Sequence, residues 1–417
     1  MARLQPVRGT HDILGDKSLR FRTIFEIFKS VAERYSHQEI DTPIFEFTET
    51  FKRTLGDTSD VVTKEMYTFE DRGGEQVTLR PEFTAGIARA FMSNGLQQST
   101  PCKFYSFGPT FRYERPQKGR MRQFHQMDVE IIGVAQAQAD IEVLAIAQDL
   151  LNELGIAQHI TLELNSLGDP ESRADYRDAL VKYFSQYKDK LSEDSVTRLE
   201  KNPMRILDSK DEGDRVLVEN APRIGEYYND ATKEFFAEVR GGLEGLGIEY
   251  HINDRLVRGL DYYCHTAFEF TTDQLGAQGT VLAGGRYDGL MEMMGGPKTA
   301  GIGWASGMER MAELISDDLV RKPDRPVVVT PVGDASQSAA MKIAHDLRSA
   351  GLVVDMAYKG NVGKRMKKAN KQNAQFAILI GEDEITRSVA MVKNLDQGRQ
   401  EEISLSNLAS YLEDNKQ

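Results

Sequence analysis

Hydrophobic residues near the N-terminus follow first a helical and then a strand-like spacing. Between residues 17 and 35 they recur every three or four positions, which predicts an amphipathic helix that begins near Asp16 or Ser18. Residues 40–47 then alternate with Pro43 among them, a pattern typical of an edge strand or of a strand at an interface. Further strands are predicted at 76–80, 102–107 and 123–133. Their short connections indicate a mainly antiparallel sheet flanked by helices.

The pattern changes at residue 169. The segment 169–247 is highly charged and has helical spacing over 172–187 and 231–246. Strand-like runs resume at 249–252, 262–271 and 280–283. We therefore predict a core fold in two parts, residues 1–168 and 248–316, interrupted by a helical insertion at 169–247.

A second change marks a C-terminal domain. Residues 317–326 contain acidic, basic and proline residues in the manner of a linker. From Val327 onward, strand-like runs at 327–332, 352–356 and 376–380 alternate with helical runs at 336–350 and 362–372. This alternation predicts a small α/β domain with a partly parallel sheet over 327–417. The expected class of the whole chain is α+β.

Composition narrows the class of protein. The chain has 417 residues, a formal net charge of −12 and 40% hydrophobic residues, which is typical of a soluble globular protein. Two isolated cysteines exclude a disulfide framework, and neither a signal peptide nor a transmembrane run is present. We expect a cytoplasmic protein that does not contact a membrane. Its acidic total means that any nucleic acid must bind at local basic patches.

A basic hairpin is the first candidate for chemistry. In the antiparallel pairing expected over 111–130, Arg112 and Glu114 share one face, and Gln126 and Glu130 share another. The bend contains four cationic residues: Arg115, Lys118, Arg120 and Arg122. Because like charges repel, a polyanion such as a nucleoside triphosphate would neutralise them. A solvated hairpin with a charged tip explains this segment equally well.

Glycine-rich phosphate loops of the two common kinds are absent, so a nucleotide site would have to consist of side chains. Arg112, Arg258 and Arg310 are candidate phosphate ligands, because each lies in an apolar or glycine-containing setting and a guanidinium binds two oxygens at once. Taken singly, each arginine is better explained by a structural salt bridge, so the phosphate interpretation depends on the residues that accompany them.

Aromatic and glycine residues form a second group. Gly284 and Gly285 could form a flat floor for a small ligand, and Tyr262 and Tyr263 could orient an imidazole or an amine. The alternative is a tight turn and two core tyrosines. Likewise, Glu82 and Thr84 could bind a ligand or only begin a helix.

Two segments that contain histidine are candidates for reactive groups. Cys264 and His265 are adjacent and have no second Cys/His pair nearby, which argues against a metal site. His125 could act as a general base, but a packed histidine on the hairpin arm is the favoured interpretation.

The C-terminal domain contains one strongly basic helix. Four lysines at i, i+3, i+4 and i+7 share a face of the helix predicted from Val362: Lys364, Lys367, Lys368 and Lys371. Because a solvated face usually also contains glutamates, we favour contact with a nucleic-acid backbone over simple solvation.

Taken together, these motifs resemble the histidyl-tRNA synthetases, a family of class II aminoacyl-tRNA synthetases, along essentially the whole chain. Six strings in the order of the family support the resemblance: Arg8–Asp12, Leu79–Glu82, Phe111–Gln126, Leu256–Tyr263, Ala283–Gly289 and Gly307–Arg310. The resemblance implies a six-stranded antiparallel sheet, a homodimer built partly around Pro43 and a C-terminal anticodon-binding domain. It also implies that L-histidine is activated with ATP and Mg²⁺ and is transferred to its tRNA.

The resemblance also implies roles for individual residues. Arg112 and Arg258 would hold the α-phosphate and act in catalysis, Arg310 would lie by the γ-phosphate, and Glu114 with the hairpin loop, including Arg120, would approach adenine. The α-amino group of histidine is expected near Glu82, Thr84 and Gln126. Its imidazole is expected between Glu130 and Tyr263, with Tyr262 lining the pocket.

The sequence differs from the family pattern at two places, and one alternative function is open. Phe83 stands where the family commonly has a small residue, and the Cys264–His265 continuation is also unusual, so the shape of the histidine pocket is left open. The alternative function is a non-catalytic, histidine-sensing relative that acts as the regulatory subunit of ATP phosphoribosyltransferase. Such a protein would be expected to lack the phosphate-binding arginines and the anticodon domain.

Overall fold

The computed structural model describes residues 3–56, 59, 61–116, 119–258, 262–276 and 279–416. Two compact units make up the chain, Met1–Arg321 and Lys322–Gln417, and they are called the N-terminal unit and the C-terminal unit. Within the described ranges, no helix is both long enough and apolar enough to cross a membrane.

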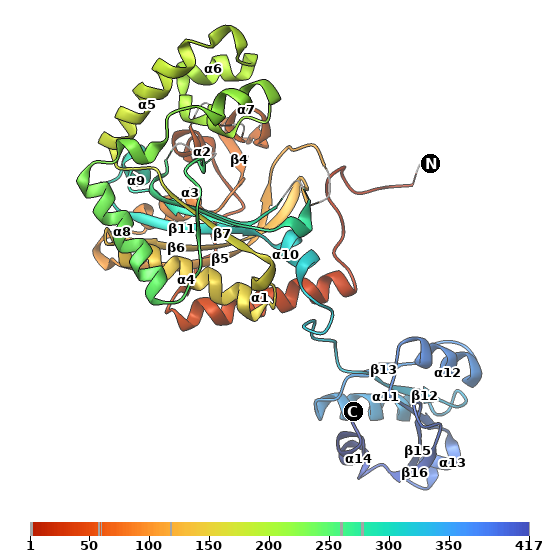
Figure 1. Ribbon diagram of the computed structural model, residues 1–417. Coiled ribbons are helices and arrows are strands. Elements are labelled where there is room, and N and C mark those ends of the chain that lie inside the picture. The colour runs from red at the N-terminus through yellow and green to blue at the C-terminus, as the bar shows by residue number, and fades with distance from the viewer. Residues whose placement is uncertain are drawn as a thin grey trace. The chain divides into compact units, whose positions relative to one another are not determined.

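An eight-stranded sheet forms the centre of the N-terminal unit (Figure 1). In their order across the sheet, the strands are β1 (Gln38–Glu39), β5 (Cys102–Phe111), β6 (Gln123–Ile132), β11 (Gly301–Gly307), β10 (Thr280–Arg286), β9 (Cys264–Thr271), β7 (Thr161–Ser166) and β8 (His251–Ile252). The six inner strands pair antiparallel, as predicted. The strand number of six is wrong, because β1 and β8 add a parallel two-residue strand at each edge. Strands this short leave no periodic signal in the sequence.

The predicted basic hairpin is confirmed as β5 and β6. The two strands pair from Cys102 opposite Ile132 to Phe111 opposite Gln123. Arg112 and Glu114 therefore follow the end of β5 and do not lie within the strand. Gln126 and Glu130 share one face of β6, because side chains two positions apart in a strand point the same way.

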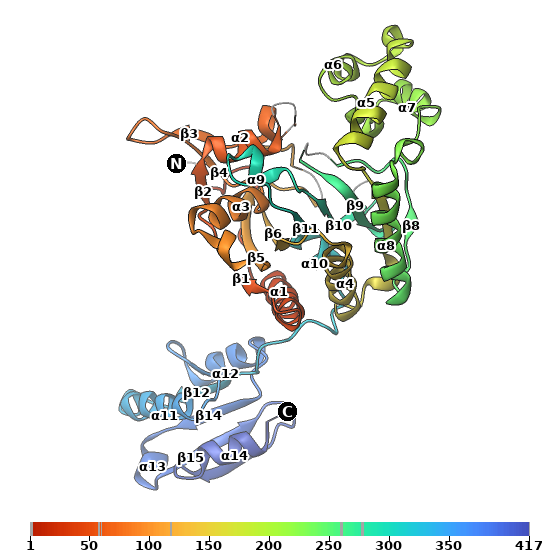
Figure 2. The ribbon, with the colours of Figure 1, turned by 90° about the vertical axis from the view of Figure 1, so that its left-hand side faces the viewer.

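Helices cover both faces of the central sheet (Figures 1 and 2). The core on one face contains residues from α1 (Asp16–Arg34), α4 (Ala137–Glu153), α8 (Asp230–Gly245) and α10 (Met308–Leu314). The core on the other face contains residues from α2 (Thr48–Leu55), α3 (Thr84–Ser93), α5 (Pro170–Ser185), α6 (Glu193–Lys201), α7 (Glu212–Glu219) and α9 (Leu290–Met293). The helical spacing noted at 17–35 corresponds to α1, whose apolar stripe buries Ile24, Phe28 and Val31.

A second, smaller sheet corrects the assignment of residues 76–80. This segment forms β4 (Gln76–Leu79), which pairs antiparallel with β2 (Phe45–Phe47) and β3 (Thr68–Glu70) and is not part of the central sheet. Sequence alternation predicts that a segment is a strand but not which strand it pairs with. The small sheet leads into α3, and so it places Glu82 and Thr84 at the start of that helix.

A fully buried ion pair joins α4 to β10. The guanidinium of Arg286 contacts the carboxylate of Asp140, and both side chains are 0% exposed. Arg286 also donates to the backbone oxygen of Val134 at 3.0 Å and to Asp288 at 3.1 Å. A buried charge is tolerated only when it is paired and hydrogen-bonded, so these contacts fix the end of β10 against α4.

The C-terminal unit has the predicted alternation of strands and helices. Its five-stranded sheet has the order β13 (Val354–Met356), β12 (Val327–Pro331), β14 (Phe376–Ile380), β15 (Val389–Asn394) and β16 (Gln400–Ser404). The first three strands are parallel and the last two antiparallel, which confirms a partly parallel sheet. The helices are α11 (Gln337–Ser349), α12 (Val362–Lys371), α13 (Glu382–Thr386) and α14 (Leu408–Asp414).

Candidate functional site

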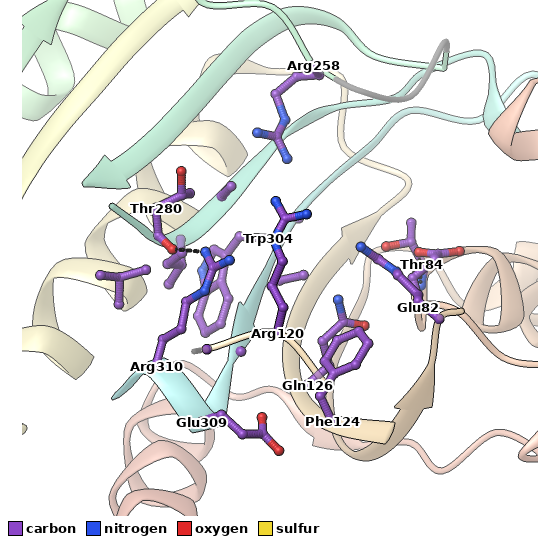
Figure 3. A pocket seen from close by; sticks show the side chains of 18 of the residues that line it. Glu82, Thr84, Arg120, Phe124, Gln126, Arg258, Thr280, Trp304, Glu309 and Arg310 are labelled. Carbon is purple, nitrogen blue, oxygen red and sulfur yellow. Dashed lines mark hydrogen bonds between the residues drawn. The ribbon is translucent and has the colours of Figure 1, made fainter. Parts of the chain in front are cut away.

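A cavity of about 230 Å³ lies against β6, β10 and β11 in the N-terminal unit. Its lining brings together side chains that are far apart in the sequence. Ten of the predicted site residues line it: Glu82, Thr84, Arg112, Glu114, Arg120, Gln126, Arg258, Tyr262, Tyr263 and Arg310. In Figure 3, Arg258 and Arg120 point toward each other across the cavity, Arg310 lies beside Thr280, and Glu82 and Thr84 lie at the other end.

The predicted residues outside this lining have two different locations. Glu130 is buried close to the cavity, where its carboxyl group accepts a hydrogen bond from the Thr84 hydroxyl at 2.6 Å. The four lysines of the basic helix lie on α12 of the C-terminal unit, and all four side chains are exposed: Lys364, Lys367, Lys368 and Lys371. Lys368 is 3.6 Å from the carboxylate of Asp355.

Four guanidinium groups line the cavity, and those of Arg120, Arg258 and Arg310 lie away from Glu82 and Thr84 (Figure 3). Arg112 donates through Nε to the backbone oxygen of Pro81 at 2.9 Å, and Arg120 contacts the Glu114 carboxylate at 2.8 Å. Arg310 donates to the backbone oxygen of Thr280. Burial, together with the nearby charges of Arg120 and Arg112, lowers the pKa of Arg310. The lowered pKa of Arg310 reflects burial first and then crowding of positive charge, and a bound polyanion would relieve the crowding.

Arg258 is held differently from the other three arginines. Burial alone would lower its pKa, but the nearby Tyr263 and Glu269 outweigh this effect and raise it. Its Nη1 atom is 2.5 Å from the Glu269 carboxylate, and its guanidinium lies 5.3 Å from the centre of the Tyr263 ring. Arg258 therefore remains charged although it is largely buried.

The opposite end of the cavity is acidic. Glu82 precedes α3, and its carboxylate accepts the backbone N–H groups of Thr84 and Ala85, each at 2.8 Å. Burial raises the pKa of Glu82, while these hydrogen bonds act to lower it. This end provides carboxylate and hydroxyl acceptors suited to an ammonium group, which has three donors and no acceptor.

The carboxyl group of Glu130 is buried and accepts hydrogen bonds from two hydroxyl groups. The Tyr287 hydroxyl donates to its second oxygen at 2.5 Å. Burial raises the pKa of Glu130 to about 8, in spite of the hydrogen bonds from Thr84 and Tyr287. The group therefore changes charge near neutral pH, within reach of the two hydroxyls that border the cavity.

The aromatic wall consists of Tyr262, Tyr263 and Tyr287. The Tyr262 and Tyr263 rings lie 4.5 Å apart, and the Tyr262 and Tyr287 rings lie 5.9 Å apart in an edge-to-face arrangement. Tyr287 lies within the motif Ala283–Gly289, but it was not predicted to be a site residue from the sequence. Its position directly after the run from Gly284 to Arg286 was the available signal.

Gly284 and Gly285 lie inside β10, so the alternative of a tight turn is wrong. A Cβ atom on Gly285 would be 2.8 Å from Cδ1 of the Tyr263 ring, and one on Gly303 of β11 would be 1.7 Å from the Glu130 carboxylate. Neither gap admits a side chain. The glycines therefore allow Tyr263 and Glu130 to pack directly against the sheet.

Asp128 is a second residue that the sequence interpretation did not place in the site. It is fully buried between Gln126 and Glu130 on β6, and neither of its carboxylate oxygens has a hydrogen-bond partner among the described residues. Burial, then the negative charges of Glu130 and Glu82, hold the pKa of Asp128 well above its usual range. Burial and the neighbouring carboxylates thus favour the neutral form of Asp128.

His125 is a packed histidine, as favoured from the sequence. Its backbone N–H donates to the Glu309 carboxylate at 3.0 Å, and its ring stacks on Phe107 at 5.9 Å. The residues that left the pocket shape open, Phe83 and the Cys264–His265 pair, do not line the cavity. In the part of the chain that the structure describes, no three His, Cys, Asp or Glu residues are placed to hold a metal ion.

Family models, individual protein sequences and solved structures all show similarity of this chain to the same family. A family model described as "Histidyl-tRNA synthetase" matches residues 9–311, and one described as "Anticodon binding domain" matches residues 326–415. The histidine–tRNA ligase of Rhodospirillum rubrum is 58% identical over 412 residues, which is 99% of each chain. The histidine–tRNA ligase of Gluconacetobacter diazotrophicus is 54% identical over the same share of each chain.

Solved structures show the same similarity. The apo histidyl-tRNA synthetase of S. aureus has a TM-score of 0.82 and 35% sequence identity, covering 98% of this chain and 99% of that one. A Bacillus halodurans structure titled as an ATP phosphoribosyltransferase regulatory subunit/histidyl-tRNA synthetase has a TM-score of 0.65, covering 91% of this chain and 99% of that one. At 20% identity, the second likeness shows the fold alone.

The perturbed Glu130 predicts how stability depends on pH. Its pKa is about 8 in the folded protein against an ordinary 4.5, so folding retains a proton that the unfolded chain releases. The resulting stabilisation is complete below pH 4.5 and is lost as the pH rises through 8. From pH 5 to pH 9, the free energy of unfolding of Glu130→Gln should therefore rise relative to wild type by roughly 2 to 4 kcal/mol.

Urea unfolding at several pH values measures this difference. The control is Glu49→Gln, which changes an exposed carboxylate, 64% accessible, in α2. Its difference from wild type should not vary above pH 6. A Glu130→Gln difference that is equally flat would show that Glu130 is ionised in the folded protein at all these pH values.

Proposed function

Because the chain belongs to the histidyl-tRNA synthetase family, we propose that it activates L-histidine with ATP and transfers the histidyl group to the 3′ end of its tRNA. The observation that carries the proposal is the cavity itself. Its lining combines four arginines with the carboxylate of Glu82, the hydroxyl of Thr84 and two tyrosines. A triphosphate fits the first set of groups, and an amino acid with an imidazole fits the second.

In the first step, a carboxylate oxygen of histidine attacks the α-phosphorus of ATP. A new P–O bond forms, the bond to the bridging oxygen breaks, and pyrophosphate leaves with the bonding electrons. We assign Arg112 and Arg258 to the α-phosphate and Arg310 to the γ-phosphate, with Glu114 and Arg120 toward adenine. Fixed cations stabilise the charge that develops on the phosphate oxygens without rearranging during the reaction.

Histidine would bind at the acidic end of the cavity. Its ammonium group would be bound by Glu82, Thr84 and Gln126, whose amide oxygen is buried and has no hydrogen-bond partner in the described chain. Its imidazole would lie between Glu130 and Tyr263, with Tyr262 beside it. An amino acid without both ring nitrogens would leave buried polar groups unpaired, which costs roughly 1 to 3 kcal/mol each.

In the second step, a hydroxyl of the terminal adenosine of the tRNA attacks the acyl carbon and AMP leaves. The division of labour that we propose assigns residues 1–168 and 248–316 to this chemistry and residues 327–417 to anticodon binding. Residues 169–247 form an insertion, and 317–326 join the two parts. Mg²⁺ would accompany ATP and neutralise part of the charge on its phosphates.

A homodimer is supported by an exposed apolar face on the small sheet. Phe45, Phe47 and Phe69 are 57%, 59% and 48% exposed. Phe47 and Phe69 both pair with Val77 of β4, and Phe45 lies two positions from Phe47, so the three rings share one face. An apolar face of this kind next to Pro43 is typical of a two-fold interface. We also assign the protein to the cytoplasm, where ATP and tRNA are available.

The regulatory-subunit alternative is not favoured. All of the arginines assigned to phosphate line the cavity, and the anticodon-binding match covers residues 326–415. The relatives that match 99% of the chain at more than half identity are histidine–tRNA ligases.

Exchange of labelled pyrophosphate into ATP tests the proposed function. Purified protein should catalyse the exchange only when L-histidine is present, and near-isosteric amino acids should not replace it. Binding of histidine without any exchange would instead identify a sensor.

Replacement of Arg258 tests the role of an arginine that we assign to the α-phosphate. In Arg258→Ala, kcat for the exchange should fall about 10²- to 10³-fold, because the charge is needed most in the transition state. The Kd for histidine, measured by calorimetry, should change less than threefold. Arg258→Lys retains the charge but not the two-oxygen geometry, so it should fall between wild type and Arg258→Ala. Equal losses of kcat and histidine affinity would contradict this role.

The basic face of α12 is assigned to the tRNA backbone. Lys364→Glu combined with Lys368→Glu should weaken tRNA binding at least about tenfold at low salt and should leave histidine-dependent exchange unchanged. The control, Lys342→Glu combined with Lys416→Glu, makes the same change in net charge elsewhere on the C-terminal unit. Filter-binding titrations at several salt concentrations compare the two. Equal tRNA affinities would indicate that the α12 face is only solvated.

A further inference from the structure

One carboxylate connects two of the arginines that line the cavity. Glu269 of β9 contacts Nη1 of Arg258 through Oε1 at 2.5 Å. Its other oxygen accepts a hydrogen bond of 2.9 Å from the hydroxyl of Thr280, which begins β10. Both carboxylate oxygens are therefore engaged, one by a cation and one by the neighbouring strand.

Thr280 extends this connection to Arg310. The backbone oxygen of Thr280 accepts a hydrogen bond from Nη1 of Arg310, drawn as the dashed line in Figure 3. The path runs Arg258, Glu269, Thr280, Arg310, and each contact is a direct one. It joins two residues that are far apart in the sequence and that are assigned to different phosphates.

The contact with Glu269 engages only one of the N–H-bearing nitrogens of Arg258, Nη1. Nε of Arg258 is buried and has no hydrogen-bond partner in the described part of the chain. A guanidinium has five N–H donors in a fixed fork, so donors of Arg258 other than the buried Nε can bind an anion in the cavity that it lines. The ion pair thus orients the group and leaves binding capacity free.

The site needs such a device because of its charge. Four guanidinium groups face one cavity, and without a ligand they repel one another. An arginine that is free to rotate loses side-chain entropy when it is fixed by a ligand. A carboxylate behind the cations lowers their mutual repulsion and fixes the geometry before ATP binds.

We propose that Glu269 is a positioning residue for adenylate formation, which holds Arg258 directly and Arg310 through Thr280. The inference rests on the proposed function and adds a residue to it. Glu269 acts through the arginines and does not itself touch the reacting atoms. Its removal should therefore affect the chemical step much more than the binding of histidine.

Glu269→Gln tests the charge with little change in shape. In pyrophosphate exchange, kcat should fall about 10- to 100-fold, the range found when a group that supports a ligand-binding residue is removed. The Kd for histidine should change less than twofold. An unchanged kcat would overturn the proposal, and so would a parallel loss of kcat and histidine affinity. Recovery of kcat at high Mg²⁺ would also overturn it and assign the carboxylate to metal binding.

Thr280 provides a second, independent test. Thr280→Val removes the hydroxyl at nearly constant size and should lower kcat about three- to tenfold, whereas Thr280→Ser retains the hydroxyl and should restore it. The double variant Glu269→Gln with Thr280→Val should lose less than the product of the two single losses, because both act through one path. Independent, fully multiplicative losses would show that no such path exists.

A matched control lies on the neighbouring strand. Glu163 of β7 is the residue directly opposite Glu269. Its carboxylate accepts a hydrogen bond from the side-chain amide of Asn253 at 2.6 Å. Glu163→Gln removes the same charge from the same region of the sheet and should leave kcat within twofold of wild type. If Glu163→Gln lowers kcat as much as Glu269→Gln does, the loss comes from removing a negative charge from this region and not from the contact with Arg258. Absence of exchange in the wild-type protein would refute the proposed function itself and not this inference.

Discussion

The buried carboxyl group of Glu130 is the point at which the parts of the site meet. It projects from β6, accepts hydroxyl groups from Thr84 at the start of α3 and from Tyr287 just after β10, and packs against Gly303 of β11. A buried carboxyl group is tolerated only if its hydrogen bonds are made. The relative positions of these four segments are therefore constrained by one polar group, and the acidic end of the cavity takes its shape from that constraint.

The cavity concentrates positive charge in an acidic protein. The chain has a net charge of −12, yet four arginines line this one cavity. Overall charge thus says little about a site whose ligand binding depends on local fields. Each of the four arginines has its own partner. Arg112 and Arg310 each donate to a backbone oxygen, and Arg120 and Arg258 each contact a carboxylate. This arrangement keeps the guanidinium groups in place when no anion is bound.

Two buried polar contacts support the site from outside the cavity. The ion pair between Asp140 and Arg286 fixes the end of β10, immediately before Tyr287. The indole N–H of Trp304 donates to the backbone oxygen of Val143 at 3.0 Å and joins β11 to α4. Because both contacts connect the sheet to the same helix, α4 serves as a rigid support beneath the strands that carry the cavity.

The amino-acid sequence alone determined the elements whose signals are local. Period-3.6 and period-2 spacing identified α1, the β5–β6 hairpin and the alternation in the C-terminal unit, because each depends on neighbouring residues. Short strings such as Leu256–Tyr263 indicated the family and residues that line the cavity. Only the tertiary structure decided that residues 76–79 pair in a separate sheet, that Tyr287 binds Glu130 and that Glu269 connects Arg258 to Thr280. Those contacts join segments brought together by chain folding, and no local pattern encodes which distant partner a strand or a carboxylate will meet.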